Sequence, residues 1–359
     1  MKKQNVIPMV MAGVLISVLL LLSSCQPQTV QVEKVVEQTV QVAQTVVVEV
    51  EKKAPGEGYK MAAIFPGVIT DTDYNTLGYV GLTTLKTNLG MEIAYSESVP
   101  VPDVETVMRD YLDAGYNIIW THGGQFIAQT VELAKQFPDV VFIGEGDAPV
   151  EDPPANFWFI DRNFHNGFYA IGALAAKATK TGKIGYIGGL TLPFSNAEVH
   201  AIQQAIADTG ADVEFNAVWT GDFNDPAKAR QVADAMIADG VDVIMGSLNL
   251  GMFGIFEAVN AVPDKNILVT AKYSDKIAFA PKNYITSVIY DFSIPLNEIA
   301  TKVIDGETGG IFTFGFGQGV SFQFPLKNVS PELSAEIEAL VQDIASGKIE
   351  VKKDINPIE

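Results

Sequence analysis

The sequence predicts an α/β protein of two doubly wound, Rossmann-like lobes with a ligand cleft between them. From residue 59 onward, short apolar runs alternate with amphipathic segments, which is typical of parallel sheets covered by helices on both faces. The strand-like runs are too many for one compact sheet. The alternation is also interrupted near residues 160–166, where we expect the chain to pass from one lobe to the other.

Each expected strand is a short, mostly apolar run followed by a polar or glycine-containing loop. These runs are residues 60–65, 91–98, 117–121, 140–144, 156–160, 183–189, 213–219, 242–247, 266–271 and 284–289. The expected helices carry apolar residues three or four positions apart, at residues 77–89, 104–114, 128–136, 166–178, 197–208, 226–239, 254–262 and 294–304. We therefore expect an N-terminal lobe from residues 58–162 and 291–310, and a C-terminal lobe from residues 163–290 and 311–359.

Composition and charge exclude several classes of protein. The 359 residues include 24 basic and 43 acidic side chains, a net charge of −19, and 48% are hydrophobic. Disordered acidic chains are poorer in apolar residues, and nucleic-acid binding needs a basic face. One cysteine excludes an internal disulfide. Three scattered histidines without CxxC or HExxH argue against zinc, and we expect no metal and no cofactor.

The N-terminus has the layout of an export signal. Lys2 and Lys3 precede 17 uncharged residues, 6–22, a run that is short for a membrane-spanning helix. Leu22-Ser23-Ser24-Cys25 resembles the bacterial lipobox, which implies a signal peptide over residues 1–24 and a lipidated Cys25. The alternative is an ordinary membrane anchor with an incidental cysteine.

Residues 25–57 have a composition of their own, dominated by valine, glutamine, threonine and glutamate. Their apolar positions recur at mixed spacings, which specifies neither a helix nor a strand. We interpret this segment as a flexible tether between the lipid anchor and the folded part. An oligomerisation stalk is the alternative, although we expect a monomer.

The candidate ligand-binding residues lie in loops directly after the expected strands, because ligands of doubly wound sheets bind beyond the carboxyl ends of the strands. These loops contain Asp73, Tyr74, Asn75, His122, Gly123, Gly124, Asp147, Trp219, Phe223 and Asn249. Aromatic rings offer stacking surfaces, and amide or carboxylate groups can bind the edge of a heterocycle. The loops hold no lysine or arginine, which argues against a strongly anionic ligand.

Each candidate also has a purely structural explanation. Asp73 and Asp225 each precede an expected helix and can cap it. Gly123 and Gly124 can serve a tight turn, and His122 can be a hydrogen-bonded loop residue. The aromatic side chains can pack at the edges of the lobes.

Residues 59–350 resemble the basic-membrane-protein family of substrate-binding lipoproteins. Asp71–Asn75 is similar to the family's Asp-Lys-Ser-Phe-Asn segment, Phe168–Ala176 to its Phe-x-x-Gly-Ala-Leu-Ala-Ala helix, and Gly221–Asp225 to its Gly-Ser-Phe-x-Asp segment. The order and spacing of these motifs carry the resemblance. It implies a type I periplasmic-binding fold and an ABC importer permease as partner.

Known members of that family bind purine nucleosides, which implies roles for particular residues here. The two aromatic side chains that sandwich the base are similar to Tyr74 and Phe223. The asparagine and aspartate that bind the base edge are similar to Asn75 and Asp147.

The resemblance fails at the residues that hold the ribose. The family has an aspartate after a late strand and a lysine after the next one. Here Ala271 and Lys272 stand near the first position and Tyr290 near the second. We therefore expect a nucleobase-like ligand, and Tyr290 or Asn249 become candidates for holding a sugar if a nucleoside binds.

Other functions remain open at this point. An enzyme is disfavoured because no GxSxG occurs, and Gly315–Gly319 lacks the strand–turn–helix context of a dinucleotide site. A ligand-sensing surface lipoprotein, a binder of another solute such as a sugar or riboflavin, and a structural adhesin are alternatives. We interpret the chain as a non-enzymatic, lipid-anchored binding protein outside the cytoplasm.

Overall fold

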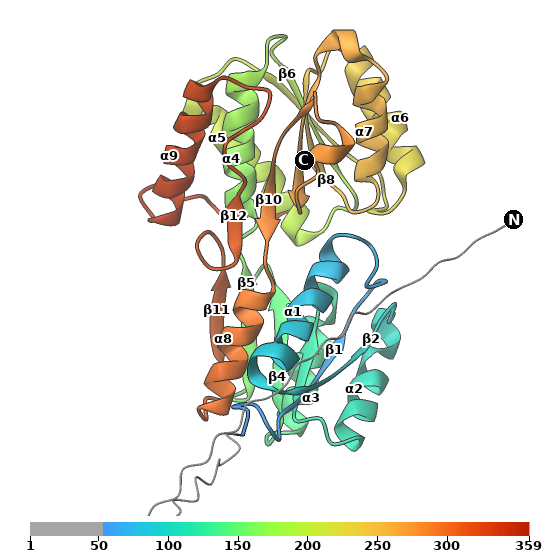
Figure 1. The fold of residues 1–359 in the computed structure, drawn as a ribbon, viewed down its shortest axis with the longest axis vertical. Helices are drawn as coiled ribbons and strands as arrows, with labels where there is room; N and C mark the ends of the chain where they lie inside the picture. Colours follow the sequence, from blue (N-terminus) through green and yellow to red (C-terminus); the bar gives the residue numbers. More distant parts are fainter. Residues whose placement is uncertain (1–52, 359) are drawn as a thin grey trace, which may run out of the picture. The chain divides into compact units, whose positions relative to one another are not determined.

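Two six-stranded sheets organise residues 53–358, the part of the chain that the computed structural model describes (Figure 1). Each sheet is flanked by helices and forms one lobe. This arrangement confirms the expected pair of doubly wound lobes. The expectations for the signal peptide, for Cys25 and for most of the tether lie outside the described residues.

The sheet of the N-terminal lobe is entirely parallel. Its order is β11 (Gly310–Phe314), β5 (Phe157–Arg162), β4 (Val141–Gly146), β3 (Ile118–Thr121), β1 (Lys60–Ile64) and β2 (Glu92–Ser96). The central strands are buried on both faces, which explains why their sequences are continuous apolar runs.

Alternate residues of β1 face opposite helix layers. Met61 and Ala63 belong to the hydrophobic cluster that includes α1 (Tyr74–Leu89) and α8 (Ser293–Ile304). Ala62 and Ile64 belong to the cluster that includes α2 (Val104–Asp113) and α3 (Ile127–Gln136). This is the period of two that a strand imposes on its side chains.

The sheet of the C-terminal lobe has the order β12 (Val320–Phe322), β10 (Tyr284–Tyr290), β9 (Leu268–Tyr273), β8 (Val243–Ser247), β6 (Lys183–Gly188) and β7 (Glu214–Trp219). It is parallel except for β12, which pairs antiparallel with β10. The helices α4 (His165–Ala178), α5 (Pro193–Thr209) and α9 (Pro331–Ala345) pack together, as do α6 (Pro226–Ala238) and α7 (Met252–Asn260).

The chain passes between the lobes at three places: after β5, after β10 and after β11. The last of these corrects an expectation. We expected the N-terminal lobe to end at residue 310, but β11 pairs with β5 over residues 310–314. Because β11 extends the first sheet, the third passage follows Phe314 and leads into β12.

Three elements near the C-terminus were not predicted from the sequence: β11, β12 and α9. The first two are short, and α9 begins at the pair Ser330-Pro331, where the Ser330 hydroxyl oxygen accepts from the Leu333 amide. Within residues 53–358, every helix is too short or too polar to cross a membrane.

Candidate functional site

Loops at the carboxyl ends of the two sheets contact each other, and we call this region the interlobe site. Asp73, before α1, forms an ion pair with Lys276, after β9, with Oδ1 and Nζ 2.7 Å apart. The Asn249 amide, after β8, lies 3.4 Å from the Asp71 carboxylate. The lobes are therefore in direct polar contact at the edge where doubly wound sheets bind ligands.

The start of α1 shows how the sequence arranges this edge. The Asp71 carboxylate accepts from the backbone amides of Asp73, Asn75 and Thr76 at 3.0–3.1 Å. Asp71 therefore caps the helix, and the expectation that Asp73 does so is wrong. The Asp73 side chain is free to reach Lys276 in the other lobe. Asp225 caps α6 as expected, accepting from the Lys228 amide.

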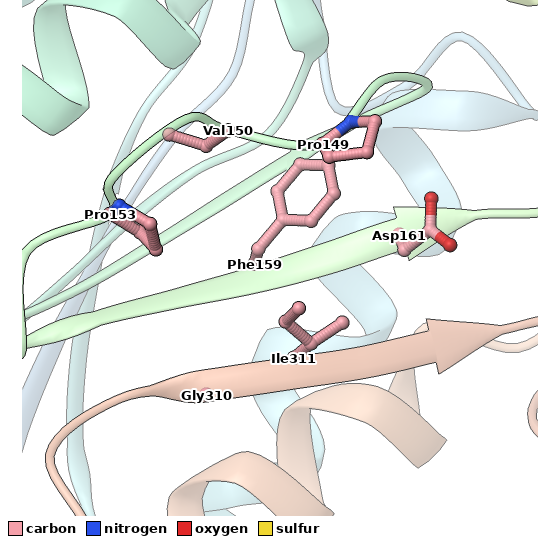
Figure 2. Close-up of a pocket in the computed structure, with 7 residues that line it drawn as sticks. All are labelled: Pro149, Val150, Pro153, Phe159, Asp161, Gly310 and Ile311. Carbon is pink, nitrogen blue, oxygen red and sulfur yellow. The ribbon is translucent and has the colours of Figure 1, made fainter.

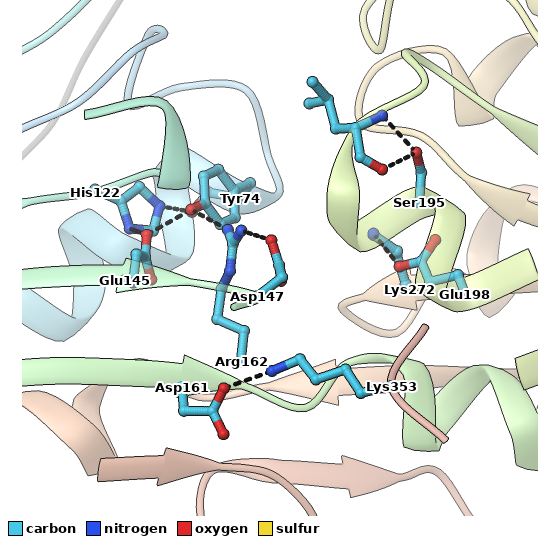
Figure 3. A network of polar contacts seen from close by, with 11 residues as sticks. Tyr74, His122, Glu145, Asp147, Asp161, Arg162, Ser195, Glu198, Lys272 and Lys353 are labelled. Atoms are coloured by element: carbon cyan, nitrogen blue, oxygen red, sulfur yellow. Dashed lines mark hydrogen bonds and ion pairs between the residues drawn. The ribbon is translucent and has the colours of Figure 1, made fainter. Parts of the chain in front are cut away.

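Tyr74, the first residue of α1, is fixed through its hydroxyl group (Figure 3). The hydroxyl donates to Glu145 Oε1 at 2.5 Å and accepts from Arg162 Nη1 at 3.0 Å. Glu145 lies in β4 and Arg162 ends β5, so two neighbouring strands orient one ring. Burial and the Glu145 carboxylate raise the pKa of Tyr74, so its hydroxyl remains a donor.

His122 covers one face of Tyr74. The two rings stack with centroids 3.9 Å apart at an angle of 21°. The His122 Nε2 lies 3.0 Å from the Tyr74 carbonyl oxygen, and Nδ1 lies 2.9 Å from Glu145 Oε1. The imidazole therefore lies between two oxygen atoms, one on α1 and one on β4. His122 is fully buried and supports Tyr74.

The other residues of this network are charged and buried. Arg162 Nη2 donates to Asp147 Oδ2. Burial opposes the charge of Arg162, but Asp147, Tyr74 and Glu145 together outweigh this effect and raise the pKa of Arg162. Burial likewise opposes ionisation of Glu145, but the charge of His122 and the hydrogen bonds lower its pKa. The expected base-binding Asp147 thus has one oxygen committed to Arg162.

A second buried cluster lies in the C-terminal lobe. Lys272 in β9 donates to Glu198 Oε1 at 2.9 Å. The hydroxyls of Tyr186 and Ser247 donate to Glu198 Oε2 at 2.8 and 2.7 Å. Burial lowers the pKa of Lys272, although Glu198 opposes this. Both oxygens of the Glu198 carboxylate therefore have partners within the protein.

The expected aromatic partner Phe223 packs within its own lobe. Its ring lies against Gly189, where a Cβ atom would come within 2.2 Å of it. It also stacks on Phe194 with centroids 5.9 Å apart at 26°. The Phe194 ring in turn lies 5.7 Å from the Arg162 guanidinium carbon. Arg162 and Phe194 thus connect Tyr74 to Phe223.

The remaining candidates are Gly123, Gly124, Trp219 and Tyr290, and each has a structural role or a contact within the protein. Gly123 has a φ of +128°, as a tight turn requires, and a Cβ at Gly124 would lie 3.1 Å from Arg162 Nη2. Trp219 packs on Tyr186 with centroids 6.1 Å apart. Tyr290 is buried, with its ring 4.2 Å from that of Phe164.

The charged residues that dominate the site have no role predicted from the sequence: Glu145, Arg162, Glu198, Lys272 and Lys276. The loops considered as candidates contain no cation, but Arg162 and Lys272 lie within strands, and Lys276 lies in the loop after β9. Each of these cations has a carboxylate partner, so the site offers no unpaired positive charge among the described residues. No cluster of three or more metal-ligating side chains occurs within residues 53–358.

Several buried polar atoms in the interlobe site have no hydrogen-bond partner among the described residues. They include Oδ2 of Asp73, Oδ1 of Asn75 and Nε of Arg162. Buried polar atoms are nearly always paired, so such atoms indicate a missing partner such as a ligand or water. These three atoms are two acceptors and one donor.

Two cavities lie away from the interlobe site. One, of about 100 Å³, lies between β5, β11 and the loop after β4, where Phe159 and Ile311 line it (Figure 2). Ligand pockets usually measure about 300–1,000 Å³, so this cavity is too small for a heterocycle. The other, of about 330 Å³, lies beside the amino ends of β9 and β10, opposite the expected edge.

A comparison with protein families decides the affiliation of the chain. A family profile described as "ABC transporter substrate-binding protein PnrA-like" matches residues 59–354. The chain belongs to this family. The family resemblance drawn from the motifs is thereby confirmed. PnrA-like proteins are the extracytoplasmic substrate-binding components of ABC transporters.

Individual PnrA-like relatives are distant but match over most of their length. Basic membrane protein A2 of Borrelia garinii is 28% identical over 298 residues, 81% of this chain and 87% of the relative. A purine-binding protein of Brucella abortus is 27% identical over 249 residues, 69% of each chain. The nucleoside-binding protein BmpA of Lactococcus lactis is 26% identical over 305 residues, 79% and 86% of the two chains.

Solved structures show the same fold. An ABC transporter solute-binding protein from Aeropyrum pernix aligns with a TM-score of 0.68 at 21% identity, covering 82% of this chain and 94% of that one. One from Conexibacter woesei aligns with a TM-score of 0.65 at 22% identity, covering 82% and 99%. At these identities the likeness establishes the type I solute-binding fold and nothing about the ligand.

Proposed function

We propose that this PnrA-like protein captures a purine nucleobase or a similar flat heterocycle between its lobes and delivers it to an ABC importer. It performs no chemistry on the ligand. The observation that carries the proposal is the fixed orientation of Tyr74 next to the unpartnered Asn75 Oδ1. An aromatic ring can stack on a bound heterocycle, and a polar atom beside it can bind the edge of that heterocycle. The Brucella and Lactococcus relatives, named for purine and nucleoside binding, support this ligand class.

The preorganisation of Tyr74 favours a stacked ligand. Its hydroxyl is held by Glu145 and Arg162, and one face is covered by His122. A ligand stacking on the remaining face would not need to order the ring first, which lowers the entropic cost of binding. Stacking of a base on one aromatic ring contributes about 1–3 kcal/mol.

The charges of the site favour a neutral ligand that donates hydrogen bonds. The three cations Arg162, Lys272 and Lys276 are matched by carboxylates, so an anion gains no free positive partner. The unpartnered oxygens of Asp73 and Asn75 are acceptors. The amino and imino groups of a purine edge are suitable donors for them.

The cluster around Glu198 favours a base over a nucleoside. Lys272, Tyr186 and Ser247 already occupy both carboxylate oxygens. Hydroxyl groups of a ribose would have to displace one of these partners, which leaves a buried group unsatisfied. We therefore assign the free base as the preferred ligand.

The proposal includes a lipid anchor at Cys25, based on the segment Leu22–Cys25. Several acyl chains on one cysteine would hold the protein stably on the outer side of the cytoplasmic membrane. Labelling of growing cells with radioactive palmitate tests this point. We expect label in the wild type and none in Cys25→Ser; label in both variants would contradict it.

A thermal-shift panel on the refolded, ligand-free protein tests the ligand class. The panel contains purine and pyrimidine bases, their nucleosides, riboflavin, sugars and amino acids. A ligand that binds the folded state raises the melting temperature, and we expect this for purine bases. A shift with sugars or amino acids alone would overturn the proposed ligand class.

A further inference from the structure

Phe194 lies in the first turn of α5, and its position is fixed by the turn itself. Pro193 begins the helix, and the Ser195 hydroxyl accepts from the Leu192 amide at 2.9 Å and donates to the Leu190 carbonyl at 2.7 Å. Figure 3 shows Ser195 bonded to the preceding turn. These contacts hold the turn that carries Phe194 at the carboxyl end of the second sheet.

The Phe194 ring lies between groups of both lobes. The Lys272 ammonium is 4.6 Å from the ring centroid, and the Arg162 guanidinium carbon is 5.7 Å from it. Phe223 stacks against the ring from a third direction. Both cations are themselves held by carboxylates, so the cation–π contacts add to a rigid setting.

Two side chains of α5 contact Lys272. Glu198 lies four residues after Phe194 and therefore on the same face of α5. Glu198 takes the ammonium hydrogen bond, while Phe194 covers the ammonium with its ring. The other Glu198 oxygen accepts from the Tyr186 and Ser247 hydroxyls. A carboxylate, an ammonium group and two hydroxyls are the kinds of groups that bind sugar hydroxyls, and the Phe194 ring covers the ammonium group among them.

We infer that Phe194 determines the size of the ligand, by filling the space beside Lys272 that a sugar substituent on a bound base would need. This inference rests on the proposed function, because it assigns a selectivity to the same site. Truncation of the ring would open the space and expose the Lys272–Glu198 cluster to hydroxyl groups.

The test is calorimetric titration of the full protein with adenine, guanine and their ribonucleosides. The variants are Phe194→Ala, Phe194→Leu, which keeps most of the volume, and Phe279→Ala, which removes an exposed ring of the same lobe. We expect the wild type, Phe194→Leu and Phe279→Ala to prefer the base by at least about tenfold. In Phe194→Ala the affinity for the nucleoside should rise by about tenfold.

The outcomes separate this inference from the proposed function. If the wild type prefers bases and truncation leaves that preference unchanged, Phe194 is not the determinant and the inference fails alone. The same holds if truncation weakens base binding without any gain for nucleosides. If the wild type binds nucleosides as tightly as bases, the inference fails. If it binds no purine compound, both fail. Phe194→Val is the truncated variant if Phe194→Ala does not fold.

Discussion

The ion pair between Asp73 and Lys276 predicts how the free energy of unfolding changes with pH. Both side chains are almost completely excluded from solvent. Burial raises the pKa of Asp73 from 3.8 to about 6, although the charge of Lys276 opposes this. The buried pair therefore costs free energy relative to a protonated Asp73. Replacement by asparagine, which is isosteric and always uncharged, isolates this cost.

The magnitude follows from linkage between folding and protonation. Between pH 3.8 and about 6 the folded protein keeps a proton on Asp73 that the unfolded chain has lost. The unfolding free energy contributed by Asp73 therefore falls as the pH rises through this window. One pKa unit corresponds to about 1.4 kcal/mol, so the fall approaches about 3 kcal/mol.

The assay is urea unfolding of the wild type and Asp73→Asn at about pH 4 and about pH 7. The quantity that matters is the wild-type unfolding free energy minus that of the variant. Because more than half of Asp73 in the unfolded chain is already ionised at about pH 4, we expect the difference to fall by about 2–2.5 kcal/mol between about pH 4 and about pH 7. A difference that grows with pH would refute this reasoning, because the ion pair would then stabilise the fold.

Three further substitutions probe the interlobe site. Tyr74→Phe removes the hydroxyl that Glu145 accepts from, and we expect urea unfolding to show a loss of about 1–3 kcal/mol; unchanged stability would mean that the short contact contributes nothing. Glu198→Gln leaves the Lys272 ammonium buried without a counter-charge, so thermal and urea unfolding should show a loss of about 3–5 kcal/mol. A variant as stable as the wild type would contradict the closed cluster. Phe223→Ala should weaken purine binding by at least about tenfold in calorimetry while far-ultraviolet circular dichroism stays unchanged; unaltered affinity would show that Phe223 only packs.

The architecture could be predicted because buried parallel strands have uninterrupted apolar sequences. The β3 residues Ile118–Thr121 are all buried, as their apolar sequence predicts for a central strand. The last strands gave weaker signals: β12 has three residues, and β11 alternates buried and exposed positions. The start of α9 could have been found from Ser330-Pro331, a capping residue followed by proline at the first helical position.

The site was predicted less completely than the fold, for a physical reason. Tyr74 and Asp147 follow strands and could be predicted from their place in loops. Glu145 and Arg162 lie inside β4 and β5, where a charged residue in a buried strand is itself the signal, since charges are seldom buried without a functional or structural partner. Pairings between distant residues, such as Asp73 with Lys276, depend on how the two lobes meet and are not written in local sequence patterns.

The most direct test of the account is the affinity of the ligand-free protein for a purine base and for the corresponding nucleoside. Calorimetric titration after unfolding and refolding, which strips any carried-over ligand, measures both. We expect saturable binding of the base and at least about tenfold weaker binding of the nucleoside. Absence of binding to every purine compound, with clear binding of a sugar or an amino acid, would contradict it.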